Sequence, residues 1–137
     1  MQNDTTAAGI AGLILLAHGS RDALWRKPIE AVLGAVRQTR PHGLAACAYL
    51  EACAPDLPTA ARGLVEAGAT RITVLPLFLG TGKHAREDIP KLVQEIRHTH
   101  PQVAVELEPA VGEHPRVTAL LAELALAATE PSGRSGS

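Results

Sequence analysis

Short runs of apolar residues alternate along the chain with segments in which apolar positions recur every three or four residues. Apolar runs without polar alternation are typical of strands that are buried on both faces of a parallel sheet. The third run ends at Pro76, and regular pairing should stop there because proline cannot donate a ladder hydrogen bond. The runs predict strands at residues 13–17, 44–50, 71–75 and 103–107.

The segments between and after these strands have the period of amphipathic helices. We expect the first helix to start near Pro28, and the second to open at Pro55 and close at Gly68. Each helix should bury one apolar stripe. The four stripes are Trp25, Ile29, Val32, Leu33 and Val36; Leu57, Leu64 and Val65; Ile89, Leu92, Val93 and Ile96; and Val117, Leu120, Leu121 and Leu124.

Strands that alternate with helices predict an α/β fold with a parallel sheet. The simplest arrangement is a single doubly wound, four-stranded sheet of order 2-1-3-4 with helices on both faces. One domain at residues 12–129 accounts for all of these elements. Residues 1–11 are expected to be a disordered or frayed N-terminus, and the Ser/Gly-rich residues 130–137 a flexible tail.

Composition and charge exclude several classes of partner. Aromatic residues make up only 2% of the 137 residues, which disfavours the stacking surface that single-stranded nucleic acids need. A net charge of −1 disfavours a broad surface for nucleic acid or membrane. The polar N-terminus lacks the basic start of a signal peptide, and the apolar run 10–17 is too short to span a bilayer. We therefore expect a cytoplasmic protein with Cys47 and Cys53 as free, buried or half-buried thiols.

Two histidines directly follow strands that flank the expected topological switch point of the sheet. Ligands bind beyond the carboxyl ends of strands where the strand order reverses, here between the first and third strands. His18 follows the first strand, and His84 follows the third after a glycine-rich loop. Glu51 closes the second strand on the same rim, so we expect all three side chains to converge. Imidazole and carboxylate suit divalent first-row metals, and a neutral imidazole can also accept a proton near neutral pH.

The loop Gly80-Thr81-Gly82-Lys83 does not match a phosphate-binding motif, because Leu77 and His84 stand where a P-loop needs Gly and Ser or Thr. Its glycines instead let the backbone approach a flat or bulky ligand. Ser20 either caps the first helix or contacts the ligand. Positive charge around the opening of the expected site favours an anionic substrate. The residues that supply it are Arg21, Lys83 and Arg86.

The remaining four histidines are expected to have structural or surface positions. His42, His98 and His100 lie at or beyond helix ends, away from the rim, and are expected at the surface. His114 could approach the rim, but its position before Pro115 favours a role at the start of the last helix.

Three segments together resemble the small class II tetrapyrrole chelatases, the sirohydrochlorin cobaltochelatases and ferrochelatases. They are Leu15-Leu16-Ala17-His18-Gly19-Ser20-Arg21; Tyr49-Leu50-Glu51 before Pro55; and Pro76-Leu77-Phe78-Leu79-Gly80-Thr81-Gly82-Lys83-His84 with Asp88-Ile89-Pro90. The similarity extends over residues 13–127. It implies insertion of Co²⁺ or Fe²⁺, or in some relatives Ni²⁺, into sirohydrochlorin without ATP or an organic cofactor, with the metal as a substrate.

The resemblance also implies roles for single residues. His18 would bind the metal and accept pyrrole protons, and His84 would be a second metal ligand. Residues 79–83, from Leu79 to Lys83, would line the macrocycle, and residues 51–54 would contact it from the other side. Some relatives carry an acidic residue where this chain has Ala54, which leaves more of any carboxylate contact to Glu51. Because the short members resemble one half of longer two-domain chelatases, a homodimer is implied.

Two other functions remain open at this point. The same site would serve a carrier that delivers a metal or tetrapyrrole without catalysis. A phosphohistidine enzyme is a further alternative, because His-Gly follows a strand, but such mutases have Arg before the His where this chain has Ala17.

Overall fold

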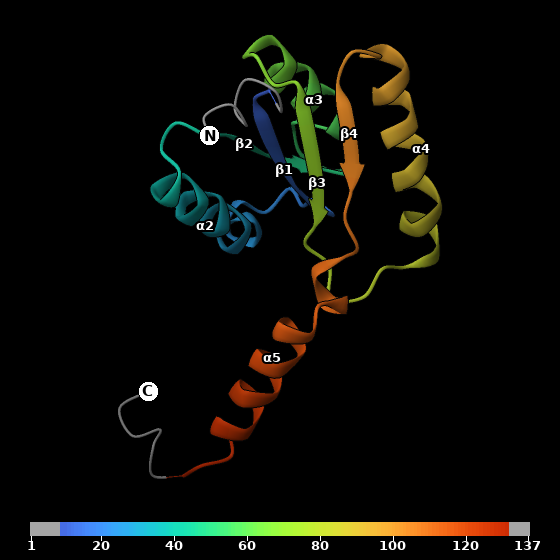
Figure 1. Ribbon diagram of the computed structural model, residues 1–137. Coiled ribbons are helices and arrows are strands. Elements are labelled where there is room, and N and C mark those ends of the chain that lie inside the picture. The colour runs from blue at the N-terminus through green and yellow to red at the C-terminus, as the bar shows by residue number, and fades with distance from the viewer. Residues whose placement is uncertain (1–8, 132–137) are drawn as a thin grey trace.

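A computed structural model describes residues 9–131 of the chain, and within them a four-stranded parallel sheet forms the centre of the molecule (Figure 1). The strands are β1 (Ala11–Ala17), β2 (Leu44–Tyr49), β3 (Arg71–Pro76) and β4 (Ala104–Leu107). Their order is β2-β1-β3-β4, and every neighbouring pair is parallel. The predicted fold class and strand order are confirmed. Pro76 is the last residue of β3, as expected for a residue that cannot donate to the ladder.

One face of the sheet is sealed by two helices, α3 (Leu57–Glu66) and α4 (Lys83–Thr99). Alternate residues of the strands point to this face, and Ile14, Leu16, Ile72 and Val74 on it are completely buried. The helices contribute the stripes that the sequence predicts, and Leu57, Leu64, Ile89, Val93 and Ile96 are buried in the same cluster. This layer is the main hydrophobic core.

The opposite face carries α2 (Ala23–Thr39), which packs over β1 and β2 (Figure 1). Ile29 and Leu33 pack against the small cluster of this face, which is built on Leu15, Ala17, Cys47 and Tyr49. No residue of α2, all of which the structure describes, is fully buried. The expected burial of Trp25 and Val32 is therefore wrong: both are exposed, because α2 lies over only the β1–β2 side of the sheet.

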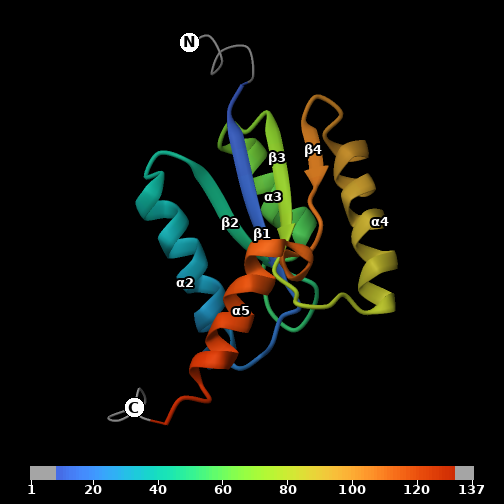
Figure 2. The same cartoon turned by 60° about the horizontal axis from the view of Figure 1, so that its bottom comes forward.

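The last helix, α5 (Pro115–Ala127), follows a short 3₁₀ helix, η1 (Val111–Glu113), and projects away from the sheet (Figures 1 and 2). None of its residues, which all lie within the described part of the chain, is buried. The prediction that Val117, Leu120, Leu121 and Leu124 form a buried stripe is wrong for a single chain. The apolar stripe exists, but nothing in the described chain covers it.

Two helices begin at aspartates and not at the prolines that suggested their starts. Asp22 is the N-cap of α2 and accepts the N–H of Leu24 at 2.9 Å, so Pro28 lies inside the helix. Asp56 is the N-cap of α3 and accepts the N–H of Thr59 at 2.9 Å, so Pro55 lies before it. A carboxylate at these positions satisfies a free N–H of the first turn, whereas proline only removes one.

The ends of the domain are described in part. Residues 1–8 and 132–137, where most of the expected frayed N-terminus and flexible tail fall, lie outside the described residues. Within residues 9–131 Ile10 already pairs with Thr70, whose N–H donates to the Ile10 carbonyl at 2.8 Å, and Ala11 belongs to β1. None of the helices in this range is long and apolar enough to cross a membrane.

Candidate functional site

His18 lies at the carboxyl end of the central strand β1, at the switch point that the strand order predicts. Its side chain is exposed, and its ring stacks on Phe78 with a centroid distance of 4.3 Å and an interplanar angle of 28°. Phe78 follows β3 and is itself buried, so the two strands that flank the switch point each supply one ring. Stacking restricts the orientation of the imidazole while its nitrogens stay open to a ligand.

Phe78 is not among the site residues that the sequence predicts. Its signal is nevertheless visible, because Phe78 is the sole phenylalanine of an aromatic-poor chain and stands just beyond a predicted strand.

The backbone at His18 is held against the loop that follows β2. The His18 carbonyl accepts the N–H groups of Leu50 at 3.1 Å and Glu51 at 3.0 Å. Gly19 has a φ of +106°, and a Cβ there would overlap the carbonyl oxygen of Glu51, so only glycine fits at this position. The chain thus fixes the position of His18 before any ligand is present.

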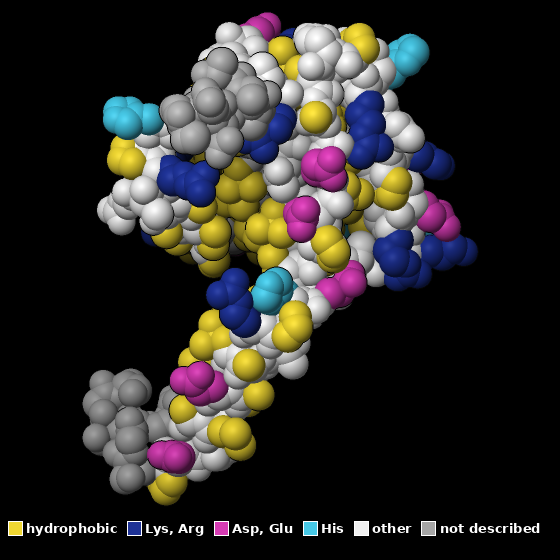
Figure 3. Space-filling model, viewed as in Figure 1, with side chains coloured by type: hydrophobic (Ala, Val, Ile, Leu, Met, Phe, Trp, Pro, Cys, Tyr) yellow, Lys and Arg dark blue, Asp and Glu magenta, His cyan; other side chains and the backbone are white. Residues whose placement is uncertain are grey.

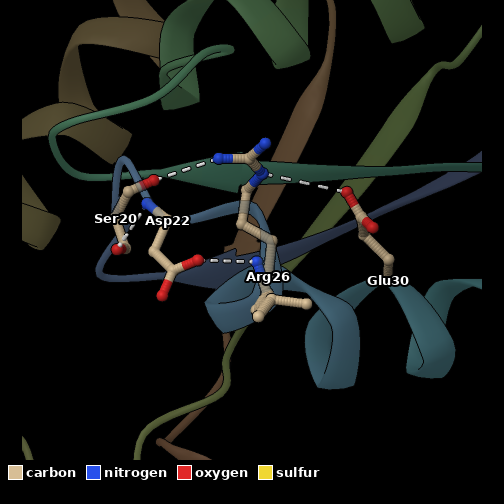
Figure 4. Close-up of polar contacts among 5 residues, drawn as sticks. Ser20, Asp22, Arg26 and Glu30 are labelled. Carbon is tan, nitrogen blue, oxygen red and sulfur yellow. Dashed lines mark hydrogen bonds and ion pairs between the residues drawn. The ribbon is translucent and has the colours of Figure 1, made fainter.

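Ser20 organises the turn after His18 but does not cap the helix (Figure 4). Its Oγ accepts the N–H of Asp22 at 3.0 Å, and its carbonyl accepts Nη1 of Arg26 at 3.1 Å. Arg26 also lies 3.9 Å from Glu30 through Nε. Of the two expected roles of Ser20, helix capping is wrong because Asp22 has it, and contact with a ligand stays a prediction. Asp22 and Arg26 were missed because their roles depend on local folding of this turn.

The glycine-rich loop presents an open backbone next to the switch point. A Cβ at Gly80 or Gly82 would have no described atom within 4 Å, so packing within the chain does not require glycine at either position. Leu79 at the start of the loop is 66% exposed. Packing therefore leaves the backbone of both glycines uncovered, and contact of this loop with a flat ligand stays a prediction.

The end of this loop leads directly into α4. Gly82 is the N-cap, Lys83 is the first helical residue, and His84 lies in the first turn with an exposed side chain. Arg86 donates Nη1 to the Thr81 carbonyl at 2.6 Å and so braces the loop, while its side chain stays exposed and keeps its positive charge. The side chains of Arg21 and Lys83 are also exposed, so all three predicted positive charges lie at the surface.

Glu51 and Ala54 lie in the exposed loop after β2. This loop is tightly turned, with Ala52 at a φ of +70° and the Cys53 N–H donating to the Glu51 carbonyl at 2.8 Å. Within residues 9–131 no three His, Cys, Asp or Glu side chains are grouped so that they could hold a metal ion. The expected convergence of Glu51 with both imidazoles into one donor set is thus not seen in this chain alone.

Two other ionisable groups near the rim remain protonated at neutral pH. Burial raises the pKa of the Cys47 thiol, and burial with a contribution from Cys47 raises the pKa of Tyr49 to about 12. Neither group is therefore available as a base near pH 7. Both cysteines are free thiols, Cys47 buried and Cys53 half-buried, as predicted.

The remaining histidines have structural positions. His114 is the N-cap of α5, and its Nδ1 accepts the N–H of Arg116 at 3.1 Å, which confirms the predicted role at the helix start. His42 and His98 are exposed, and His100 is the half-buried C-cap of α4. The imidazoles of the rim are thus His18 and His84.

The fold and this rim define a class: a small doubly wound α/β domain with one histidine after each of the two strands at the switch point. The CbiX family model matches residues 12–128, which is most of the chain. The chain belongs to the CbiX family.

Two named relatives bear on the function of this family. The sirohydrochlorin cobaltochelatase of Sulfolobus acidocaldarius is 30% identical over 90% of this chain and 97% of its own length. The sirohydrochlorin ferrochelatase of Priestia megaterium is 29% identical over 81% of this chain. This chain spans only 42% of that longer enzyme.

Solved structures agree with the fold. The CbiX protein of Marinobacter aquaeolei VT8 superposes with a TM-score of 0.74 at 32% identity, covering 85% of this chain and 94% of the other. SirB from Bacillus subtilis with Fe³⁺ superposes with a TM-score of 0.75 at 24% identity, covering 89% of this chain and 48% of SirB. The second likeness concerns the fold alone.

Proposed function

We propose that this protein is a sirohydrochlorin chelatase, which inserts Co²⁺ or Fe²⁺, or Ni²⁺, into the macrocycle without ATP. The observation that carries the proposal is the exposed imidazole of His18, stacked on Phe78 at the switch point beside an open glycine-rich loop. Membership of a family whose named relatives are sirohydrochlorin cobaltochelatases and ferrochelatases supports it.

The chemistry needs a group that binds a divalent metal and accepts protons. As metal–nitrogen bonds form in the macrocycle, the pyrrole N–H groups lose their protons, and a nearby base has to take them. A neutral imidazole is a good ligand for first-row metals and a base suited to neutral pH. In this proposal His18 receives the metal and then a pyrrole proton, and His84 from the first turn of α4 is the second metal ligand.

The rim provides contacts for the rest of the substrate. The open backbone from Leu79 to Lys83 lies against the flat macrocycle, because Gly80 and Gly82 leave room above it. The exposed charges of Arg21 and Lys83 bind the peripheral carboxylates of sirohydrochlorin. Glu51 and Ala54 contact the macrocycle from the loop after β2, and Ser20 is a polar contact between the two sides.

Three further assignments belong to this proposal. The metal is a substrate, and no organic cofactor takes part. The free thiols Cys47 and Cys53 are consistent with the reducing cytoplasm. Because this chain spans 42% of the Priestia megaterium enzyme, a homodimer of this chain would supply the second half of the cleft.

The test is a steady-state insertion assay with sirohydrochlorin and Co²⁺, Fe²⁺ or Ni²⁺ in turn, followed by the absorption change of the macrocycle. We expect many turnovers per protein molecule. His18→Ala should lower kcat/KM by about 10²–10⁴-fold, because both a ligand and a base are lost, and His84→Ala should give a smaller loss. His42→Ala is the matched control, since His42 is exposed and far from the rim.

The melting temperature is measured for each variant, so that loss of activity is separated from loss of folding. Unchanged kcat/KM in both rim variants would overturn the assignment of His18 and His84. A single stoichiometric delivery of metal or macrocycle, without turnover, would indicate a carrier.

A further inference from the structure

The single Phe, Tyr and Trp of this chain all lie at the carboxyl edge of the sheet. Phe78 follows β3 and stacks on His18. Tyr49 is the last residue of β2, and Trp25 in the first turn of α2 packs beside it, with ring centroids 6.5 Å apart and an interplanar angle of 60°. The chain therefore places all three of these rings at the edge of the sheet that carries His18.

Of these three rings, only that of Trp25 reaches the surface. Tyr49 and Phe78 are buried, whereas Trp25 is 38% exposed and its neighbour Leu24 is 66% exposed. Hydrophobic side chains also fill the hollow between α2 and the middle of the sheet (Figure 3). The start of α2 thus presents a large apolar pair to solvent at the rim, and covering this pair with a ligand would be favourable.

The helices α2 and α4 begin at this edge in the same way, on opposite faces of the sheet (Figure 1). Each follows one of the two central strands and spans 17 residues. The fourth residue of each helix is an arginine whose Nη1 donates to a carbonyl of the preceding loop. Arg26 donates to Ser20 at 3.1 Å, and Arg86 donates to Thr81 at 2.6 Å. The two loops are thus braced by equivalent contacts.

This match gives Leu24 and His84 equivalent places at the rim. Each is the second residue of its helix, and each has an exposed side chain. Side chains of a helix lean toward its N-terminus, so both extend from the first turn toward the space beyond the carboxyl edge. His84 borders that space from the β3 side, and Leu24 with Trp25 borders it from the β1 side.

We propose that Leu24 and Trp25 form an apolar wall of the substrate site, against which the sirohydrochlorin ring packs on the opposite side of the rim from His84. This inference rests on the proposed function. A tetrapyrrole is a flat, conjugated ring with carboxylates at its periphery, and an indole beside an aliphatic side chain suits the surface of such a ring. The exposed Arg21 precedes the wall and suits a peripheral carboxylate.

The wall contributes to binding and not to the metal exchange itself. Neither an indole nor an aliphatic side chain binds a first-row metal or accepts a pyrrole proton, so Leu24 and Trp25 have no part in the chemical step. Contacts that are equally strong before and during the reaction change KM and leave kcat as it is. Loss of the wall should therefore differ from loss of His18, which lowers kcat.

The first test measures the Kd of metal-free sirohydrochlorin by ultrafiltration, and kcat and KM of insertion, for the same variants. Trp25→Ala should raise Kd and KM by about tenfold, and Leu24→Ala by less, because part of the apolar contact is lost. The kcat of both should stay within about twofold of the parent value. Trp25→Phe keeps an aromatic ring and should recover most of the affinity. Val32→Ala is the matched control, since Val32 is 41% exposed on α2 but lies about two turns farther from the rim.

The melting temperature of each variant separates lost contacts from lost folding. Because Leu24 is largely exposed, Leu24→Ala tests the wall even where Trp25→Ala lowers stability. An unchanged Kd in both alanine variants, or an equal rise for Val32→Ala, overturns the inference.

The second test asks whether the bound ring covers Leu24. In a Cys53→Ser background, Leu24→Cys is alkylated by a maleimide with and without metal-free sirohydrochlorin, and Val32→Cys is the control. We expect the ring to slow alkylation at position 24 and not at position 32. An equal rate at position 24 with the ring bound contradicts the wall. Protection at position 24 in a chain without turnover would leave the wall in place and remove the chelatase function, so the two failures are distinguishable.

Discussion

The two faces of the sheet differ in how completely one chain covers them. On the α3–α4 face, Ile14, Leu16, Ile72 and Val74 are inaccessible to solvent, and both helices are held along their length. On the α2 face, the helix has no fully buried residue, and Leu75 and Leu77 are partly open. The same strands build both faces with the same kinds of apolar residues, so the difference comes from the number of helices that one chain brings.

The two faces therefore contribute differently to stability and to accessibility. The sealed face stabilises the domain, because burial of apolar surface is the main favourable contribution to folding. The open face and the rim beside it stay accessible within residues 9–131. His18 lies at the end of β1, where the backbone is fixed by the loop after β2, so a rigid layer supports a rim that stays accessible.

Matched truncations in β3 should produce the largest difference in stability between the faces. Ile72 points to the sealed face and Leu75 to the open one, and both lose the same number of carbon atoms on substitution by alanine. Ile72→Ala should lower the free energy of unfolding by about 3–5 kcal/mol, because it leaves a cavity in a closed core. Leu75→Ala should cost less than about 2 kcal/mol in the monomer, since part of its surface is already in water.

Urea unfolding at low protein concentration measures both losses. Equal losses would contradict the contrast between the faces. At high concentration the cost of Leu75→Ala should increase if a second copy covers this residue, whereas that of Ile72→Ala should not change.

The sequence predicts the sealed part of the fold well because the apolar residues there are buried by other parts of the same chain. The apolar runs of β1 to β4 and the stripe of α4, with Ile89, Val93 and Ile96, report burial that the chain itself provides. A stripe such as that of α5 reports only that a face will be covered. It does not say which molecule covers it, so Leu120 and Leu124 were expected in the core of their own chain.

For the site, the sequence predicts where the two histidines lie but not the contacts that their neighbours make. The position of His18 and His84 follows from where strands end, and that depends on topology alone. The stacking of His18 on Phe78 and the bond from Arg86 to Thr81 depend on side-chain packing, which no periodicity encodes. Helix starts were misplaced for a related reason, since the capping carboxylates of Asp22 and Asp56 act through local backbone geometry.

Those two caps give the next, smaller contrast. Asp56→Ala should lower the free energy of unfolding by about 1–2 kcal/mol, because α3 belongs to the sealed core. Asp22→Ala should lower it by about 0.5–1 kcal/mol, because α2 is held less tightly. Chemical denaturation at pH 7 measures both costs. A larger cost for Asp22→Ala would indicate that α2 is the more firmly packed helix.

Acid provides a second measurement on the Asp56 cap. Hydrogen bonds from Thr59 hold the pKa of Asp56 below its ordinary value of 3.8. A carboxylate whose pKa is lowered on folding contributes stability above that ordinary value, and this contribution is lost as the pH falls through and below it. Asp56→Asn keeps an acceptor for the Thr59 N–H but cannot titrate. Its stability should therefore fall less between pH 5 and pH 3 than that of the parent chain, and an equal fall would contradict the role of this cap.

The smallest contrast uses two glycines inside helices, Gly63 in α3 and Gly34 in α2. A Cβ at either position would meet no described atom within 4 Å, so alanine fits without strain at both. Each substitution should stabilise the chain by at most about 1 kcal/mol, because alanine loses less backbone entropy than glycine on folding. The gain appears in full only if the helix stays formed until the whole domain unfolds. We expect the full gain for Gly63→Ala and a smaller one for Gly34→Ala in thermal unfolding of the monomer. Equal gains would show that α2 unfolds together with the sealed core, although it buries no residue of its own.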